Sequence, residues 1–152
     1  MPAKNVTVKE AHDLQSEGHT YVDVRSVPEF TQAHPSGAVN VPLLHRDERT
    51  GQMSPNHEFL QVMRASFAPE TKLLIGCQAG ARSAQAAEIL TEAGFTNVSN
   101  VLGGFGGARD SMTGQVRAEG WLSAGLPVEQ GATAGHTYDD LRSRASEGKP
   151  QR

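Results

Sequence analysis

The stretch LLIGCQAGARS, residues 73–83, places the only cysteine of the chain between a short apolar run and a turn rich in glycine and alanine. The apolar run predicts a central strand over Thr71–Gly76. The sequence ARSAQAAEILTEAGF, which begins at Ala81, predicts the longest helix of the chain. Cys77 is therefore predicted at the carboxyl end of a strand, where open α/β sheets bind their ligands.

Four further short runs predict strands on either side of this one: Lys4–Val6, Thr20–Val24, Gly37–Pro42 and Asn97–Leu102. Helices are expected between them, at about 8–16, 29–33 and 56–67. Because strands and helices alternate, we predict an α/β fold, with a five-stranded and mostly parallel sheet flanked by helices on both faces. The polar residues 43–55 are expected to form a loop, and we identify no internal repeat.

The segment after the fifth predicted strand is rich in glycine and has no clear periodicity. Its GGFGG sequence, residues 103–107, does not fit the dinucleotide-binding pattern, and we interpret these glycines as turn and close-packing residues. A final short helix carrying Trp121 is expected within 116–129. Residues 131–152 are predicted to be a partly disordered tail that contains one helical turn, in YDDLRSRA.

Composition bounds the function. The 152 residues suit one domain, and a net charge of −3 without a basic run gives no support for binding to nucleic acid or to an anionic membrane. No apolar stretch approaches the roughly 20 residues of a membrane span, and we see no signal peptide. A single cysteine cannot form an internal disulfide, which favours a reducing, cytoplasmic location. The histidines show no metal-ligand spacing, so no metal site is expected.

The residues around Cys77 indicate a nucleophilic thiolate. Gly76 and Gly80, with small neighbours, allow the backbone to curl so that successive N–H groups point inward. Such a nest at the N-terminus of a helix binds anions and favours a thiolate over a thiol. Arg82 could add a permanent positive charge and a planar set of donors for an oxyanion. The alternative is a buried structural cysteine, which is common among free cysteines.

Five segments, taken in order, resemble the single-domain rhodanese family of sulfurtransferases. They are VDVRSVPEF (22–30), FTQAHPSGAVNVP (30–42), LLIGCQAGARSAQAAEIL (73–90), GFTNVSNVLGGF (94–105) and GWLSAGLPVE (120–129). The resemblance covers about residues 4–130, which we take as the domain. Ala33 stands where the family usually has glycine. A tryptophan usually follows GGF within a few residues, but here it is Trp121, so 106–119 looks like an insertion.

The resemblance implies a parallel sheet with strand order 3-2-4-5-1 and a two-step reaction. The Cys77 thiolate would attack a small anionic sulfur donor such as thiosulfate, become a persulfide, and pass the sulfur to cyanide or to a thiol, including a protein thiol. No metal or organic cofactor is implied. The substrate-binding loop would consist of Gln78, Ala79, Gly80, Ala81, Arg82 and Ser83, whose N–H groups would hold the persulfide.

Two other functions remain open. Related phosphatases and arsenate reductases place five residues between cysteine and arginine, whereas four separate Cys77 from Arg82 here, which favours the sulfurtransferase. The other alternative is a sulfur-carrier or regulatory module, for which the insertion Gly106–Glu119 and the C-terminal tail could bind a partner protein.

Asp23 and Arg25, at the end of the second predicted strand, are candidate supporting residues of the site and have two interpretations. They could supply charge beside the pocket. Alternatively, Arg25 could form an ion pair with Glu29 that stabilises the turn after the strand. Ser83 could bond the thiolate or cap the helix. His34, which matches a family histidine, is expected to bond backbone around its turn.

Overall fold

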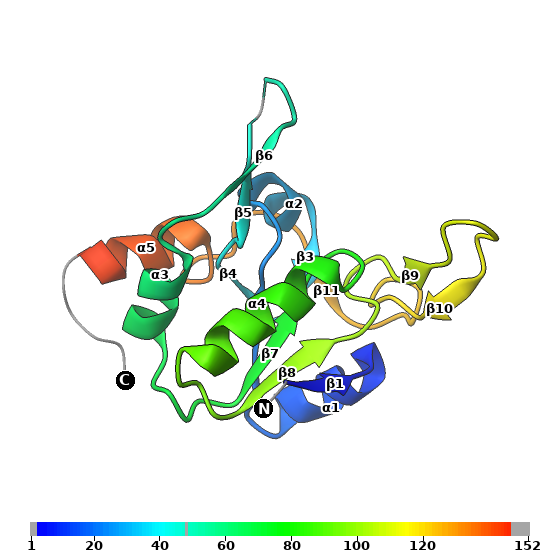
Figure 1. Ribbon diagram of the computed structural model, residues 1–152, viewed down its shortest axis with the longest axis horizontal. Helices are drawn as coiled ribbons and strands as arrows, with labels where there is room; N and C mark the ends of the chain where they lie inside the picture. Colours follow the sequence, from blue (N-terminus) through cyan, green and yellow to red (C-terminus); the bar gives the residue numbers. More distant parts are fainter. Residues whose placement is uncertain (1–2, 48, 147–152) are drawn as a thin grey trace.

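The fold is built on a central parallel sheet of five strands, seen in a computed structural model that describes residues 3–47 and 49–146 (Figure 1). Its strands are β1 (Lys4–Val6), β2 (Thr20–Asp23), β4 (Val39–Asn40), β7 (Leu73–Gly76) and β8 (Val98–Val101). They lie in the order β1-β8-β7-β2-β4, and each neighbouring pair is parallel. This is the predicted order, read from the opposite edge, so the α/β class and the sheet topology are confirmed.

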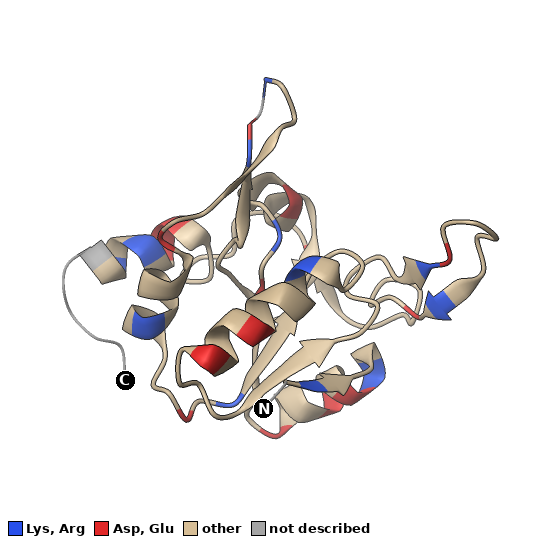
Figure 2. Cartoon of the chain, in the orientation of Figure 1, with Lys and Arg blue, Asp and Glu red and all other residues tan. Residues whose placement is uncertain are grey.

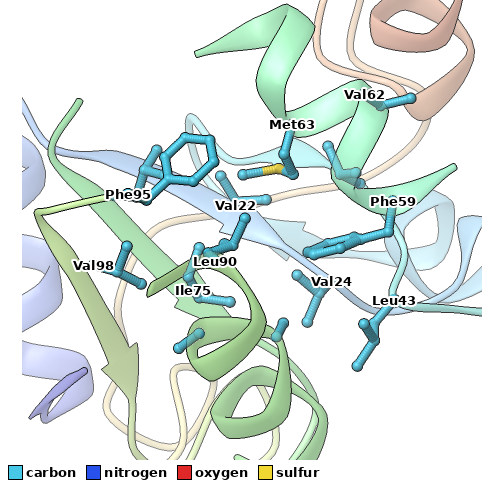
Figure 3. Packing of buried hydrophobic residues seen from close by; sticks show 14 of the residues in the cluster. Val22, Val24, Leu43, Phe59, Val62, Met63, Ile75, Leu90, Phe95 and Val98 are labelled. Atoms are coloured by element: carbon cyan, nitrogen blue, oxygen red, sulfur yellow. The ribbon is translucent and has the colours of Figure 1, made fainter. Parts of the chain in front are cut away.

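Helices cover both faces of the sheet because the central strands are apolar on both sides. Alternate residues of β7 show this: Leu73 and Ile75 belong to one buried cluster and Leu74 to another. The first face is covered by α3 (Phe59–Ser66), α4 (Ala81–Glu92) and α5 (Tyr138–Ser146). Figure 3 shows part of this cluster, with Met63 and Leu90 beside the sheet residues. The second face is covered by α1 (Val8–Ser16), α2 (Val27–Gln32) and the segment around Trp121.

Local sequence signals set the helix ends. Thr7 caps α1 with a capping box, in which the Glu10 N–H donates to Thr7 Oγ1 at 3.1 Å and the Thr7 N–H donates to Glu10 Oε1 at 2.8 Å. Helix α4 ends at Glu92 with Ala93 as its C-cap, and the next residue, Gly94, has a φ of 107° that favours glycine. Both helix ends thus follow from local sequence signals.

The expectation of a loop over residues 43–55 was wrong. This segment contains a hairpin, β5 (Leu44–Arg46) and β6 (Met53–Pro55), and the expected insertion contains a second one, β9 (Ala108–Arg109) and β10 (Val116–Ala118). In Figure 1 both hairpins project beyond the body of the domain. These strands were not predicted from the sequence because a hairpin outside the core needs no alternation of apolar and polar residues, and that alternation is the usual signal for a strand.

The two hairpins are built on the same short sequence, which corrects the expectation of no internal repeat. RDERTGQM (46–53) and RDSMTGQV (109–116) share five of eight residues. In the second hairpin, Asp110 Oδ1 accepts hydrogen bonds from the N–H groups of Met112 and Thr113 at 2.8 and 3.1 Å. In the first, Asp47 Oδ1 accepts the equivalent bonds at the same two distances. The repeat therefore encodes one turn geometry, twice.

The segment around Trp121 forms a turn, where a short helix was expected. Gly125, with a φ of 73°, and Pro127 interrupt any helix at this point. The turn buries Trp121 completely, and its indole Nε1 donates to the Pro127 carbonyl at 2.7 Å. Beyond it, β11 (Val128–Glu129) pairs with β3 (His34–Pro35) in an antiparallel ribbon.

Part of the predicted tail belongs to the packed core. Helix α5 contacts α3, and Tyr138 and Leu141 are buried in the first cluster. The Asn56 side chain also donates to the Tyr138 hydroxyl at 3.1 Å. The expected single helical turn is thus a helix of nine residues. The disorder predicted for the last residues concerns 147–152, which lie outside the described residues. Among the described helices, none has the length and apolar character needed to cross a bilayer.

Candidate active site

Cys77 lies at the carboxyl edge of the sheet, between β7 and α4, with its sulfur surrounded by backbone amides. The Gly80 N–H donates to Sγ at 3.0 Å, and the Ser83 N–H donates to Sγ at 3.3 Å. Gly80 caps α4 with a φ of 109°, so a side chain at this position would be strained. The cysteine is only 2% exposed. The sulfur therefore sits in a nest of N–H dipoles at a helix N-terminus, an arrangement that stabilises negative charge.

The Ser83 side chain connects the sulfur to a buried polar chain. Ser83 Oγ lies 3.3 Å from Cys77 Sγ and donates to Asn100 Oδ1 on β8 at 2.6 Å. The Asn100 amide in turn donates to Asn5 Oδ1 at 3.1 Å. Ser83 thus contacts the sulfur and also bonds the Gly80 carbonyl at 3.2 Å within the first turn. Asn100 is not among the site residues predicted from the sequence, although a buried asparagine in a strand is a signal for such a role, since buried polar groups need hydrogen-bond partners.

The glycine-rich stretch after β8 packs against the cysteine loop and forms backbone hydrogen bonds with it. The Phe105 N–H donates to the Cys77 carbonyl at 2.7 Å, and the Gly106 N–H donates to the Gln78 carbonyl at 2.9 Å. Gly104 has a φ of 56°, and a Cβ atom there would lie 2.2 Å from the Cys77 carbonyl oxygen. Close packing of backbone against backbone, as predicted for GGFGG, is therefore confirmed. After the insertion the chain comes back to this glycine-rich stretch, since the Trp121 N–H donates to the Gly104 carbonyl at 2.9 Å.

We expect Gly104→Ala to destabilise the protein by more than the ~1–2 kcal/mol that a left-handed backbone alone costs a side chain. The added Cβ would also push the Cys77 carbonyl away. Urea unfolding measures the change. Gly114→Ala is the matched control, because Gly114 has a φ of 73° but open space around it. Equal losses of stability in the two variants would contradict the steric argument.

Asp23 and Arg25 form a buried ion pair beneath the loop. Arg25 Nη2 lies 2.8 Å from Asp23 Oδ2, and both side chains are almost fully buried. Arg25 also donates to Gln78 Oε1 at 3.3 Å, and its guanidinium lies 4.5 Å from the centre of the Phe105 ring. The expected partner of Arg25 was Glu29, and that expectation was wrong. Asp23 ends β2 and Arg25 lies two residues further on, in the bend that follows the strand, so the local chain brings the two side chains together.

Arg82 is held by Glu29 rather than left free beside the sulfur. Its Nη1 and Nη2 donate to the two carboxylate oxygens of Glu29 at 2.8 and 3.1 Å. Burial opposes the charged carboxylate, but hydrogen bonds from Arg82 and Ser26 outweigh it and lower the pKa of Glu29 to about 2. The same pairing raises the pKa of Arg82. The nest of amides, and not an unpaired arginine, is thus the anion-favouring feature nearest the sulfur.

The lowered pKa of Glu29 predicts a specific acid sensitivity. A carboxylate with a depressed folded-state pKa stabilises the protein above its ordinary value of about 4.5, and this contribution is lost as the pH falls toward about 2. We therefore expect Glu29→Gln to be less stable than the natural chain at neutral pH. The gap should narrow through this window. Urea midpoints at a series of pH values provide the measurement, and a gap that stays constant with pH would contradict the pairing.

The remaining candidate residue, His34, does what was expected of it. Its Nδ1 atom lies 2.7 Å from the Phe30 carbonyl oxygen, and its ring stacks on Phe30 with centroids 3.7 Å apart. The side chain is completely buried, and its polar contacts are with Phe30, Thr133 and Glu129, none of which belongs to the cysteine loop. In the described part of the chain, no three His, Cys, Asp or Glu side chains are grouped so that they could hold a metal ion.

Comparison with known proteins gives a consistent result. A family model described as a rhodanese-like domain matches residues 7–110. Thiosulfate sulfurtransferase 16, chloroplastic, from Arabidopsis thaliana is 38% identical over 82% of this chain and 92% of its own length. Thiosulfate sulfurtransferase 18 from the same plant is 39% identical over 66% of this chain and 74% of its own.

A solved structure agrees with these relatives. The crystal structure of Rv0390 from M. tuberculosis superposes with a TM-score of 0.70 and 31% identity, covering 86% of this chain and all of that one. The family match includes the sheet strands β2, β4, β7 and β8, the cysteine loop and the glycine-rich stretch that packs on it. On these grounds the chain belongs to the rhodanese-like family.

Proposed function

We propose that this protein is a sulfurtransferase that carries sulfane sulfur on Cys77. The observation that carries the proposal is the position of Sγ at 3.0 Å from the Gly80 N–H and 3.3 Å from the Ser83 N–H, at the N-terminus of α4. These dipoles stabilise the thiolate, which is the nucleophilic form of cysteine. Relatives named thiosulfate sulfurtransferase support the same reaction class.

The first half-reaction is a displacement at sulfur. The Cys77 thiolate attacks the outer sulfur of thiosulfate, a new S–S bond forms, and the bond to the sulfonate sulfur breaks. Sulfite leaves with the bonding electron pair, and Cys77 becomes a persulfide. No proton transfer and no redox partner is required. The amides of the loop 78–83 would hold the negative charge, which is spread over the terminal sulfur and the departing anion.

The second half-reaction returns the cysteine. A thiophilic acceptor, either cyanide or a thiolate, attacks the outer sulfur of the persulfide, and Cys77 leaves as a thiolate. The product is thiocyanate or the persulfide of the acceptor. This order of steps is a ping-pong mechanism, with the persulfide as the covalent intermediate.

Residues 4–130 form the proposed catalytic domain, and the proposed location of the protein is the cytoplasm. The first Arabidopsis relative, by contrast, is named as chloroplastic.

Turnover of thiosulfate with cyanide tests the proposal. We expect thiocyanate to form, with double-reciprocal plots that are parallel lines, as a ping-pong mechanism requires. An absence of persulfide with thiosulfate and other sulfur donors, while Cys77 stays reduced, would contradict the proposal. An aryl phosphate assay tests the phosphatase alternative, which the four-residue spacing between Cys77 and Arg82 disfavours. Hydrolysis that depends on Cys77 would reverse the ranking.

A carrier role for the same persulfide is the second candidate, and the hairpin β9–β10 favours it. This hairpin projects from the body of the domain (Figure 1). Met112, in the turn between its two strands, is 91% exposed. Methionine is frequent at surfaces that bind several different proteins, because its flexible side chain adapts to them. The rate of sulfur release to small acceptors distinguishes the two roles. A carrier forms the persulfide but passes its outer sulfur to cyanide or a small thiol slowly, whereas an enzyme forms the persulfide and passes the sulfur on rapidly.

A further inference from the structure

A concave pocket lies directly beside the cysteine loop, on the side of the hairpin β5–β6. Three elements form it: helix α2, the first turn of α4 and the hairpin. Its lining residues are Glu29, Leu44, Arg46, Gly51, Met53 and Arg82. Arg82 belongs both to this pocket and to the loop that holds the Cys77 sulfur. A molecule seated in the pocket therefore adjoins the proposed reaction site.

The charges in this pocket do not cancel. Glu29 and Arg82 neutralise each other through their double hydrogen bond. Arg46 makes no ion pair with any residue that the structure describes, and its side chain lies over Gly51, where a Cβ atom would be 3.7 Å from Nη2. Figure 2 shows basic positions on this hairpin together with an acidic one, Asp47, which is not part of the pocket lining. Among the described lining residues, the positive charge of Arg46 is the one not matched by a carboxylate, so this lining has a net positive charge, which attracts an anion.

The remaining lining residues favour binding of an apolar group. Leu44 is half-buried and Met53 is 37% exposed, so both offer apolar surface toward the pocket. Thiosulfate has no carbon, and the amides around Cys77 already suit its charge. A ligand that uses both features of the pocket has an anionic end for Arg46 and an aliphatic part for Leu44 and Met53. Among the reactants of the proposed reaction, only an organic thiol acceptor can have both.

We propose that this pocket binds the carboxylate end of a small aliphatic thiol acceptor and that Arg46 is the residue that selects it. The proposal rests on the proposed sulfurtransferase function. The thiolate of the bound acceptor attacks the outer sulfur of the Cys77 persulfide, the S–S bond to Cys77 breaks, and Cys77 leaves as a thiolate. The acceptor departs as its own persulfide. Arg46 stabilises the carboxylate of the acceptor throughout and takes no part in the bond changes.

Matched thiol pairs test the selection by charge. Turnover is measured with thiosulfate as donor and with 3-mercaptopropionate or 6-mercaptohexanoate as acceptor. Each acid is compared with the alcohol of the same chain length. The readout is the ratio of kcat/KM for the acid to kcat/KM for the alcohol. In Arg46→Gln we expect this ratio to fall by about threefold to fivefold, the size of an exposed charge contact, for at least one chain length. Arg46→Glu should lower it further.

Arg49→Gln is the matched control, because Arg49 is an exposed arginine of the same hairpin outside the pocket lining. Its ratio should equal that of the natural chain. If the ratio is unchanged in Arg46→Gln at both lengths, or falls equally in Arg49→Gln, the proposal is wrong. Persulfide formation by intact mass separates this failure from that of the function. A chain that forms no persulfide refutes the sulfurtransferase, whereas one that forms it without charge selection refutes only the acceptor pocket.

Discussion

Replacing Cys77 with serine is expected to lower sulfur transfer by more than about a thousandfold, the scale of loss that follows removal of a covalent nucleophile. A serine hydroxyl in the same nest cannot form a stable persulfide equivalent, so both half-reactions stop. The fold should remain, because serine differs from cysteine in one atom and the loop is held by backbone bonds from Phe105 and Gly106. Thiocyanate formation from thiosulfate and cyanide is the measurement.

Two controls make this result specific. The urea midpoint of Cys77→Ser should lie close to that of the natural chain, so that lost activity cannot be attributed to unfolding. Ser83→Ala should retain turnover, although at a reduced rate, because Ser83 contacts the sulfur at 3.3 Å without forming a bond to the substrate in the proposed mechanism. Natural activity in Cys77→Ser would refute the persulfide mechanism entirely.

Arg25→Met is expected to produce the largest loss of stability, about 3–5 kcal/mol in the free energy of unfolding. The substitution leaves the Asp23 carboxylate buried without its ion-pair partner, and among the described residues only the Arg25 backbone N–H, at 3.0 Å, still bonds it. It also removes the bonds to Gln78 and to the Ala33 carbonyl, so the cysteine loop loses a support. Urea denaturation gives the difference.

Arg142→Met is the matched control for Arg25→Met. Arg142 also bonds a carboxylate at 2.8 Å, that of Glu58, but the two side chains are 54% and 44% exposed. An exposed pair contributes at most about 1 kcal/mol. Losses of similar size in the two variants would show that the buried position of Arg25 is unimportant. A double variant, Asp23→Asn with Arg25→Met, should recover part of the stability because it removes the unpaired charge.

The sheet and the cysteine loop could be predicted from the sequence because both depend on strong local signals. Apolar runs such as LLIG define a buried strand, and the alternation of strands with helices defines the topology. Gly80 and the helix that follows it likewise define a nest without reference to distant residues. The capping box at Thr7 and the left-handed Gly94 were predictable for the same reason.

Features that depend on the third dimension were not predictable in this way. The partner of an arginine depends on which carboxylates are nearby in space, so the pairing of Arg82 with Glu29, 53 positions apart, could not be predicted from the sequence alone. The contact of Asn100 with Ser83 joins residues 17 positions apart. The two hairpins were missed because their information lies in turn residues, and comparing residues 46–53 with 109–116 would have detected them.

The central claim is that the sulfur of Cys77, held among amide donors, accepts and carries a second sulfur. Intact mass spectrometry after treatment with thiosulfate tests this claim most directly. We predict that the natural chain gains the mass of one sulfur atom, that the gain disappears on addition of cyanide, and that Cys77→Ser shows no gain. An unchanged mass in the natural chain with Cys77 reduced, or an equal gain in Cys77→Ser, would contradict the account.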